Sequence, residues 1–165
     1  MIHALIDHTD KILTDGTPKF DFAEPSTDPI QLSRDLAETL ILNQGLGLAA
    51  PQIGIPVRAF AMMAQQIIVC FNPRIIDESD EVIVLEEGCL SYPELFVKVK
   101  RPRRIKVRYE EPNGETVTKT FDGITARVFQ HELSHLNGIC HLDEANKYHK
   151  EQALKKWKKL QKEKN

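Results

Sequence analysis

Two histidines stand four residues apart in the stretch His131-Glu-Leu-Ser-His135, and Glu132 directly follows the first. If the stretch is helical, a rotation of about 100° per residue brings both imidazoles to one face, where they can bind a single metal ion. Such an ion lowers the pKa of the water that it holds towards about 7, and a neighbouring carboxylate can take the proton. The pattern therefore favours metal-assisted hydrolysis. Two exposed histidines on an ordinary helix are the alternative, and a third ligand would decide between them.

A helix is expected to carry both histidines. Asp122 or Thr125 can cap its start, and Gly138 suits the left-handed position after its last turn. Apolar side chains recur between them at helical spacing, at Val128, Phe129, Leu133 and Leu136. The two imidazoles are therefore expected on one rigid element.

Three carboxylates follow this helix, but each is poorly placed to complete the ligand set. Asp143 and Glu144 come within about two turns, too close for a second helix to fold back, and Glu151 lies among lysines. A zinc endopeptidase that takes its third ligand from downstream nevertheless remains an alternative hypothesis.

Cys89 lies upstream and is the better candidate for the third ligand. The apolar run at 82–85 is expected to form a short buried strand, and Gly88 interrupts it where a thiol can turn towards a neighbouring helix. A buried structural cysteine is the alternative, because an isolated thiol is more often buried than bound to a metal.

A third stretch, Gln44 to Gly54, is rich in small residues. Its paired glycines and alanines leave a backbone that another chain can approach closely, and the amide of Gln52 offers a hydrogen-bond donor just beyond them. A tight turn packed against the core is the alternative. No strand precedes the glycines and no acid follows at the required distance, so the stretch does not indicate a dinucleotide site.

Taken together, the three stretches resemble the signature of the peptide deformylase family. They occur in the family's order, at 45–52, 87–91 and 130–138, and the likeness extends over roughly residues 28–143. Further positions fit the same pattern, namely Pro102, Ile105, Val107 and Ala126-Arg-Val128. One position departs from it, because Ser134 stands where the family usually has Asp.

The resemblance implies a metal-dependent hydrolase that removes the N-formyl group from the N-terminal methionine of nascent polypeptides and releases formate. Cys89, His131 and His135 would be the metal ligands, with a fourth position left for water. Glu132 would take a proton from that water and pass it to the leaving amine.

The resemblance also implies the remaining site residues. The side chain of Gln52 and the backbone N–H of Leu90 would stabilise the oxyanion. Gly47 would bond the peptide backbone as an added strand. The residues expected to bind the substrate are Leu46, Gly47, Leu85 and Val128.

The metal that the family typically uses in vivo is ferrous iron, while zinc, nickel and cobalt can occupy the same ligands. One thiolate and two imidazoles suit several divalent ions, so the sequence does not choose among them.

Length and composition predict one domain of the α+β class. The 165 residues, 41% of them hydrophobic, are enough for one well-buried core. We expect a mainly antiparallel sheet packed around a central, metal-bearing HExxH helix, the architecture that the resemblance also implies. Residues 1–146 would form the catalytic domain, and residues 147–165 a basic C-terminal helix of the same domain.

The other elements follow from local signals. A helix is expected from Asp28-Pro29 to Gly45, with its buried face at Leu32, Leu36, Ala37, Leu40 and Ile41. Strands are expected at 57–63 and 67–71, and the run at 82–85 is expected to continue their sheet. Alternating segments at 105–109 and 115–121 predict a hairpin around the turn Pro112-Asn-Gly114.

Cysteine usage and the N-terminal sequence favour the cytoplasm and no membrane contact, and we expect the protein to be a monomer. The three cysteines, Cys70, Cys89 and Cys140, are odd in number and scattered, which argues against a disulfide framework and for a reducing compartment. The first residues lack the basic and long apolar regions of a signal peptide, and no run reaches the about 20 apolar residues of a membrane span.

The tail from Lys147 to Asn165 is strongly basic. Its eight lysines and two glutamates give a local charge of +6, so the preceding residues carry −8. A narrow apolar stripe runs along it, at Ala153, Leu154, Trp157 and Leu160. This stripe would dock on the domain or on a partner, or the lysines would only aid solubility.

The resemblance adds ribosomal RNA as a partner, since deformylases with such a C-terminal helix use it to dock on the ribosome. A catalytically idle homologue that binds through this tail is a further hypothesis, for which Ser134 is the only hint.

Overall fold

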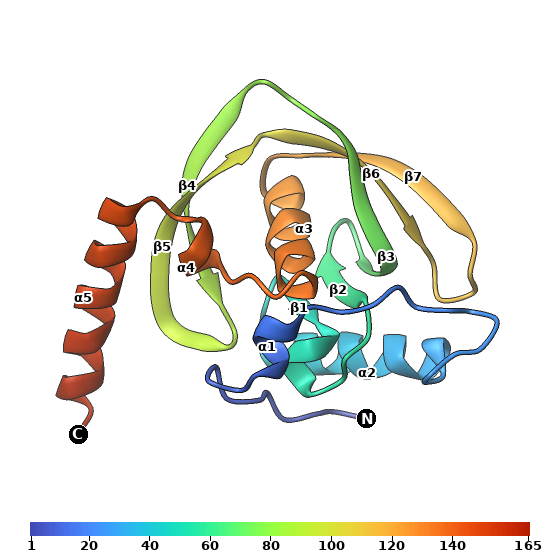
Figure 1. Cartoon of the computed structure of the whole chain (residues 1–165), viewed down its shortest axis with the longest axis horizontal. Helices are drawn as coiled ribbons and strands as arrows, with labels where there is room; N and C mark the ends of the chain where they lie inside the picture. Colours follow the sequence, from blue (N-terminus) through green and yellow to red (C-terminus); the bar gives the residue numbers. More distant parts are fainter.

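The computed structural model describes all residues from 1 to 165, and its strands curve around one central helix (Figure 1). A five-stranded antiparallel sheet has the order β1-β2-β3-β6-β7, and a separate pair is formed by β4 and β5. The strands are β1 (Gly47–Ala49), β2 (Ala59–Met63), β3 (Ile67–Glu78), β4 (Val82–Cys89), β5 (Tyr92–Pro102), β6 (Arg104–Glu110) and β7 (Thr116–Asp122). The helices are α1 (Ile12–Asp15), α2 (Pro29–Leu42), the 3-10 helix η1 (Ala50–Ile53), α3 (Gly123–Leu136), α4 (His141–Glu144) and α5 (Lys147–Glu163).

The two long helices in the first four-fifths of the chain, α2 and α3, cover opposite faces of the five-stranded sheet. Side chains of β2 alternate between these faces, because successive residues of a strand point in opposite directions. Ala59 and Ala61 pack in a cluster with the leucines of α2, whereas Phe60 and Met62 pack in a cluster with Phe129 of α3. Both faces of the strand are therefore buried.

Helix α2 starts where the sequence predicts. The carboxylate of Asp28 accepts hydrogen bonds from the backbone N–H groups of Ile30 and Gln31, and Pro29 occupies the first turn. Leu32, Leu36 and Leu40 are buried as expected. The prediction for Ile41 was wrong, because this side chain is 61% exposed. It lies about 140° around the helix from Leu36, beyond the edge of the buried stripe.

Helix α3 carries the two histidines, as expected. Gly138 has φ of 76°, the left-handed conformation predicted for the residue that ends the helix. A Cβ atom at Gly138 would lie 2.5 Å from the carbonyl oxygen of Thr14, so glycine also allows α1 to approach this end. Asp122 occupies the N-cap position without capping through its side chain, because its carboxylate pairs with Arg103 and Arg104 instead.

The segment at 82–85 does not continue the five-stranded sheet, so that prediction was wrong. It begins β4, which pairs only with β5, and its Val82, Val84 and Leu85 side chains are 44%, 48% and 37% exposed. The apolar run therefore forms a strand, but an exposed one. Only one edge of β4 has a partner strand, and no helix covers these side chains. The buried residue of β4 is the charged Glu87.

The C-terminal helix α5 docks its apolar stripe on β5, one of the outcomes expected for the tail. Ala153, Leu154 and Trp157 join a cluster with Leu95 and other residues of β5. The indole N–H of Trp157 donates to the carbonyl oxygen of Pro93 at 2.9 Å. Figure 1 shows α5 at the outer side of the β4–β5 pair, away from α2. None of the helices combines the length and the apolar character that a membrane crossing requires.

The core between α2 and the sheet gives a test of the fold. Replacing Leu36 by Ala should lower the free energy of unfolding by about 3 kcal/mol, because Leu36 is fully buried and the smaller side chain leaves a cavity. Urea or guanidinium unfolding measures the change. The matched control Ile41→Ala, on the exposed side of the same helix, should stay within about 0.5 kcal/mol of the parent protein. Equal losses in the two variants would contradict the described packing of α2.

Candidate metal site and substrate pocket

Cys89, His131 and His135 form a group that can hold a metal ion. Their ligand atoms all lie within 4.8 Å of one another, and the Cys89 sulfur is 3.2 Å from Nε2 of His135. Cys89 comes from the end of β4, and both histidines come from α3. The structure thus brings the upstream cysteine to the helix, as the sequence interpretation required.

The donor set fits a divalent ion such as zinc or ferrous iron. Metal–nitrogen and metal–sulfur bonds of about 2.0 to 2.3 Å place ligands of one ion several ångströms apart, as these three are. Nδ1 of His131 is bonded to Glu87 at 2.9 Å, which leaves its Nε2 free to bind. Burial lowers the pKa of His135 well below its usual value, so the neutral, metal-binding form of this imidazole is favoured.

None of the downstream carboxylates joins this group. Glu144 instead pairs with Arg101 at 2.6 Å, and Asp143 accepts a hydrogen bond from the backbone N–H of Cys140. The hypothesis of a third ligand from downstream therefore has no support in the geometry.

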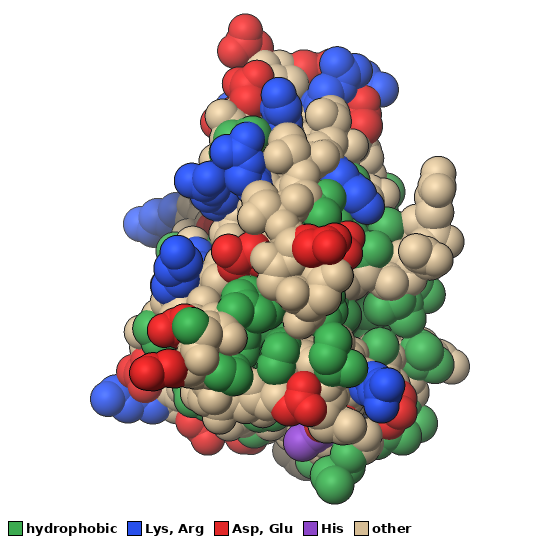
Figure 2. Space-filling view, turned by 90° about the vertical axis from the view of Figure 1, so that its right-hand side faces the viewer, with side chains coloured by type: hydrophobic (Ala, Val, Ile, Leu, Met, Phe, Trp, Pro, Cys, Tyr) green, Lys and Arg blue, Asp and Glu red, His purple; other side chains and the backbone are tan.

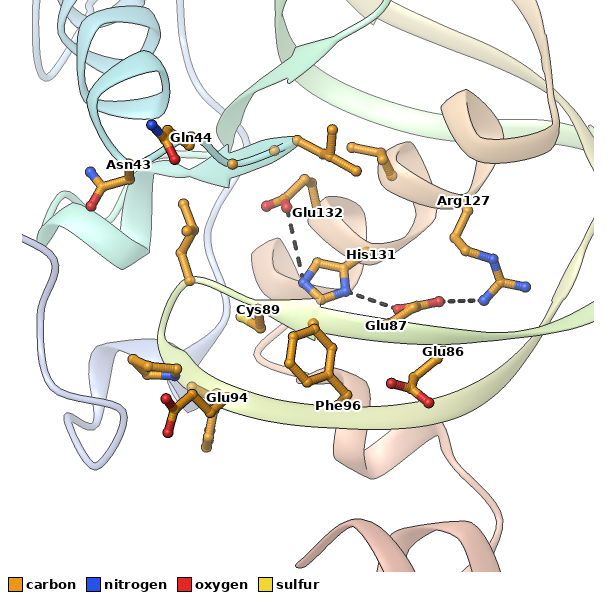
Figure 3. Close-up of a pocket in the computed structure, with 18 of the residues that line it drawn as sticks. Asn43, Gln44, Glu86, Glu87, Cys89, Glu94, Phe96, Arg127, His131 and Glu132 are labelled. Carbon is orange, nitrogen blue, oxygen red and sulfur yellow. Dashed lines mark hydrogen bonds and ion pairs between the residues drawn. The ribbon is translucent and has the colours of Figure 1, made fainter. Parts of the chain in front are cut away.

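Glu87 is the centre of a buried network that the sequence analysis did not assign to the site. Its carboxylate accepts hydrogen bonds from Arg127 and from His131 (Figure 3). It also accepts two from Arg101, through Nε and Nη2. Arg127 also donates to the carbonyl oxygens of Ile83 and Val99, and so ties α3 to β4 and β5. The available sequence signal was an acidic residue two positions before the cysteine, with arginines on two later elements.

Glu132 lies beside the metal-binding group with one oxygen free. Its Oε1 is 4.0 Å from Nε2 of His131, and its buried Oε2 has no hydrogen-bond partner in the protein. Burial, opposed by the charge of His131 and reinforced by that of Glu87, raises the pKa of Glu132 to about 7. A carboxylate whose pKa lies near neutral pH is suited to accept and return a proton.

Gly47 has to be a glycine because of Glu132. A Cβ atom at this position would lie 2.6 Å from Oε1 of Glu132 and 2.7 Å from its Cγ. No real Cβ makes such contacts, so a larger residue would displace the carboxylate. The glycine-rich stretch therefore permits a close approach, as its composition predicts. The group that approaches it is the side chain of Glu132 on α3.

Gln52 is held in one orientation next to Cys89. Its Oε1 accepts from the backbone N–H of Ala49 at 2.8 Å, which directs its Nε2 towards Ser91 at 2.9 Å and the Cys89 sulfur at 3.6 Å. The side chain of Leu90 lines the neighbouring pocket. Ser91 is a further supporting residue that the sequence analysis did not assign.

A cavity of about 590 Å³ opens beside Cys89, His131 and Glu132. Of the residues expected to bind substrate, Leu46, Gly47 and Val128 line this cavity, whereas Leu85 does not. Figure 3 shows Asn43 and Gln44 on one side of the cavity, and Glu94 and Phe96 on the other. Aromatic and acidic side chains from β4 and β5 thus join the wall, a contribution that no sequence motif indicated.

Ser134 lies on α3 immediately before His135 and is only half-buried. Arg103 and Arg104 both pair with Asp122, so these arginines are already engaged. With Ser134 at this position, the three ligand side chains still lie together and Glu132 still lies beside His131.

Two sequence comparisons identify related proteins. A profile described as polypeptide deformylase matches residues 2–151. The peptide deformylase of Thermotoga neapolitana is 47% identical over 109 residues, which make up 66% of this chain and 66% of that protein, just under two thirds of its length. The peptide deformylase of Bartonella henselae is 40% identical over 141 residues, 82% of this chain and 80% of that protein.

Solved structures agree with this result. The crystal structure of peptide deformylase from Thermotoga maritima superposes with a TM-score of 0.84 at 36% identity, covering 88% of this chain and 99% of that one. The enzyme from Ehrlichia chaffeensis gives 0.85 at 32% identity and covers 99% of both chains. A complex of the Synechococcus elongatus protein with actinonin gives 0.85 at 30% identity, covering 94% and 86%. The expected α+β fold is thereby confirmed.

Removing the thiol tests the ligand set. Cys89→Ala should weaken binding of Zn²⁺ or Co²⁺ by more than about 100-fold, since a residue that only supports a ligand costs about 10- to 100-fold. Equilibrium dialysis with elemental analysis measures the change, and loss of the thiolate-to-Co²⁺ absorption band identifies the lost ligand. Cys140→Ala, which removes another half-buried thiol, should bind the metal as the parent protein does. Full metal retention in Cys89→Ala would place the third ligand elsewhere.

Proposed function

The chain belongs to the polypeptide deformylase family, and from that premise we propose that it removes the N-formyl group from the N-terminal methionine of nascent polypeptides, releasing formate. The observation that carries the proposal is the meeting of three metal-binding side chains with the unpartnered carboxylate of Glu132 at one wall of a cavity. This arrangement suits hydrolysis of a small amide at a chain end.

Cys89, His131 and His135 would hold the ion through Sγ and the two Nε2 atoms. A divalent cation bound there would polarise the formyl carbonyl and lower the pKa of water. Glu87 keeps Nδ1 of His131 occupied, which fixes the ring with Nε2 directed at the site. Among the ions that fit this set we propose ferrous iron in the cell, with zinc, nickel or cobalt as substitutes.

Glu132 would take the proton of the attacking water through its unpartnered Oε2 and pass it to the leaving amine. The lack of a side chain at Gly47 supports this role, because it leaves room for the carboxylate at the wall of the cavity. The family role and the buried, unpaired oxygen thus point to the same residue.

Gln52 and the backbone N–H of Leu90 would stabilise the negative charge that develops on the formyl oxygen. The amide nitrogen of Gln52 lies 3.6 Å from the Cys89 sulfur, and its orientation is fixed at the other end by Ala49. Ser91 occupies one N–H of this amide, so the N–H directed at the Cys89 sulfur is the one that would donate to the formyl oxygen.

The cavity would receive the methionine side chain, and the peptide that follows would lie along its mouth. Leu46 and Val128 supply apolar wall, and Gly47 lies on β1, the edge strand of the five-stranded sheet. An extended peptide can add to such an edge through backbone hydrogen bonds. Leu85 takes no part in this proposal.

The compartment and the state of assembly are part of the same proposal. All three cysteines are free, and Cys89 has to stay reduced to bind the ion. We therefore place the protein in the cytoplasm, as a monomer, with α5 as part of the catalytic domain because its apolar stripe packs on β5.

Attachment to ribosomal RNA through α5 is a second function that the charge distribution favours. The docked stripe leaves the lysines of α5 on the outside, and seven of the eight in the tail are exposed. On the face opposite α5, by contrast, Lys and Arg are interspersed with Asp and Glu (Figure 2). A surface rich in positive charge attracts the phosphates of nucleic acid without regard to its sequence.

Loss of the base should stop the reaction and leave the metal bound. Glu132→Gln should lower kcat for formate release from a formyl-Met peptide by about 10²- to 10⁴-fold, because the amide cannot take a proton. Anaerobically prepared protein is required, with metal content measured in parallel. Glu115→Gln, at the exposed β6–β7 turn, is the control. Metal loss in Glu132→Gln would mean that this carboxylate is structural, and unchanged turnover would overturn its role as the base.

Ribosome binding can be tested without disturbing the contact between Trp157 and Pro93. Replacing Lys155, Lys158 and Lys162 with Gln should reduce co-sedimentation with ribosomes at low salt, since each lysine–phosphate contact releases counterions. Formate release from short peptides should stay within about twofold, because none of these side chains contacts the cavity.

The control variant carries the same change of charge on other elements, at Lys19, Lys106 and Lys119. The control variant should sediment with ribosomes as the parent protein does. Ribosome binding of the parent protein should weaken steeply as the salt concentration rises. Equal sedimentation of both variants and the parent, or binding indifferent to salt, would rule out a role for α5 on the ribosome.

A further inference from the structure

We propose that Glu144 is a positioning residue for the metal site, which acts through Arg101 and Glu87 on the ring of His131. The inference rests on the metal centre of the proposed function. It assigns a task in that centre to α4, a helix that supplies none of the three ligands.

A continuous chain of short hydrogen bonds connects Glu144 to His131. Nη1 of Arg101 donates to Oε2 of Glu144 at 2.6 Å, while Nε and Nη2 of the same guanidinium donate to Glu87 at 2.5 and 2.9 Å. Oε1 of Glu87 then accepts from Nδ1 of His131 at 2.9 Å. Glu144 is thus three contacts away from the imidazole ring of His131, whose other nitrogen, Nε2, faces the metal site.

The geometry of the guanidinium makes this chain sensitive to Glu144. Its planar donors have fixed directions, so occupation of Nη1 on one side holds Nε and Nη2 towards Glu87 on the other. The side chain of Arg101 is only 4% exposed, which leaves little room for water to replace a lost partner. Without Glu144 the guanidinium can rotate, and the bidentate contact that orients Glu87 is weakened.

Charge balance gives a second reason. Glu87 faces two guanidinium groups, those of Arg101 and Arg127, so these three side chains carry a net positive charge inside the protein. Glu144 contacts one of these guanidinium groups, that of Arg101, and its negative charge makes the cluster of four side chains neutral. An unbalanced positive charge beside His131 opposes binding of a cation, and buried charges are weakly screened.

Helix α4 is held in place independently of this contact. Nε2 of His141 bonds to the carbonyl oxygen of Leu95, and Leu142 packs in the apolar cluster with Leu95 and other residues of β5. Removal of the Glu144 charge should therefore leave α4 docked, and the effect on the metal site can be measured without unfolding the helix.

The test is the dissociation constant of Co²⁺, measured by chelator competition on anaerobic protein. Glu144→Gln should raise it about 10-fold, the lower end of what supporting residues contribute. Glu144→Asp, which keeps the charge, should recover a large part of the loss. The matched control Asp143→Asn makes the same carboxylate-to-amide change on the neighbouring residue, away from Arg101, and should bind Co²⁺ within about twofold of the parent protein.

A double-mutant cycle tests the route. In an Arg101→Met background, Glu144→Gln should no longer change the dissociation constant, because the residue that transmits its effect is gone. If Arg101→Met does not fold, Arg101→Lys takes its place, since an ammonium cannot contact both carboxylates through a rigid fork.

Co²⁺ binding of Glu144→Gln within twofold of the parent would overturn the inference, as would an equal loss in Asp143→Asn. A lower melting temperature without a change in Co²⁺ binding would reduce Glu144 to a structural contact. Formate release is assayed separately. A parent protein that binds Co²⁺ but releases no formate would refute the proposed function and leave this inference standing, whereas unchanged binding in an active enzyme would refute only the inference.

Discussion

The site depends on the burial of one carboxylate, that of Glu87. Its side chain is 5% exposed, and a buried charge costs several kcal/mol unless charged partners and hydrogen bonds surround it. Arg101 comes from β5, Arg127 and His131 come from α3, and Glu87 itself comes from β4, so its hydrogen bonds join three elements distant in sequence. Satisfying this group therefore places Cys89, two residues further along β4, next to the histidines of α3. The contacts that compensate the buried charge of Glu87 are thus the same ones that bring the metal ligands together.

Close packing of β1 against α3 is the second requirement. Ala49 and Ala126 are fully buried in the cluster that joins the sheet to this helix, and Gly47 lets the side chain of Glu132 lie against the strand. Small residues on β1 thus decide how near the helix can come, and the same approach directs the base towards the cavity. The glycine-rich stretch serves the site through its lack of side chains, while Gln52 just beyond supplies a polar group.

Local patterns predicted the elements whose structure is decided locally. Helix α2 follows from its cap at Asp28 and from helical spacing, and α3 follows from helical spacing and from Gly138 after its last turn. Strands β6 and β7 follow from alternation around the turn that ends at Gly114. Local patterns gave wrong predictions where strand pairing decides which side chains are buried. The apolar run that opens β4 has the composition of a buried strand, yet Val82 and Val84 are exposed because β4 leaves the main sheet and pairs with β5 alone. Strand β5 itself carries the alternation Leu95, Val97, Val99, which buries one face against α4 and α5.

The sequence by itself determined that His131 and His135 lie on one face of a helix with Glu132 beside them, because helical geometry fixes the relation of residues four apart. It also supplied three ordered motifs, whose family was identified without coordinates. Only the tertiary structure decided that Cys89, 42 positions before His131, completes the metal-binding group. It alone joined Glu87 to its arginines and brought Gly47 against Glu132. These contacts depend on how strands from different parts of the chain pair and pack around α3, and no local pattern encodes the distance between residues that meet only after folding.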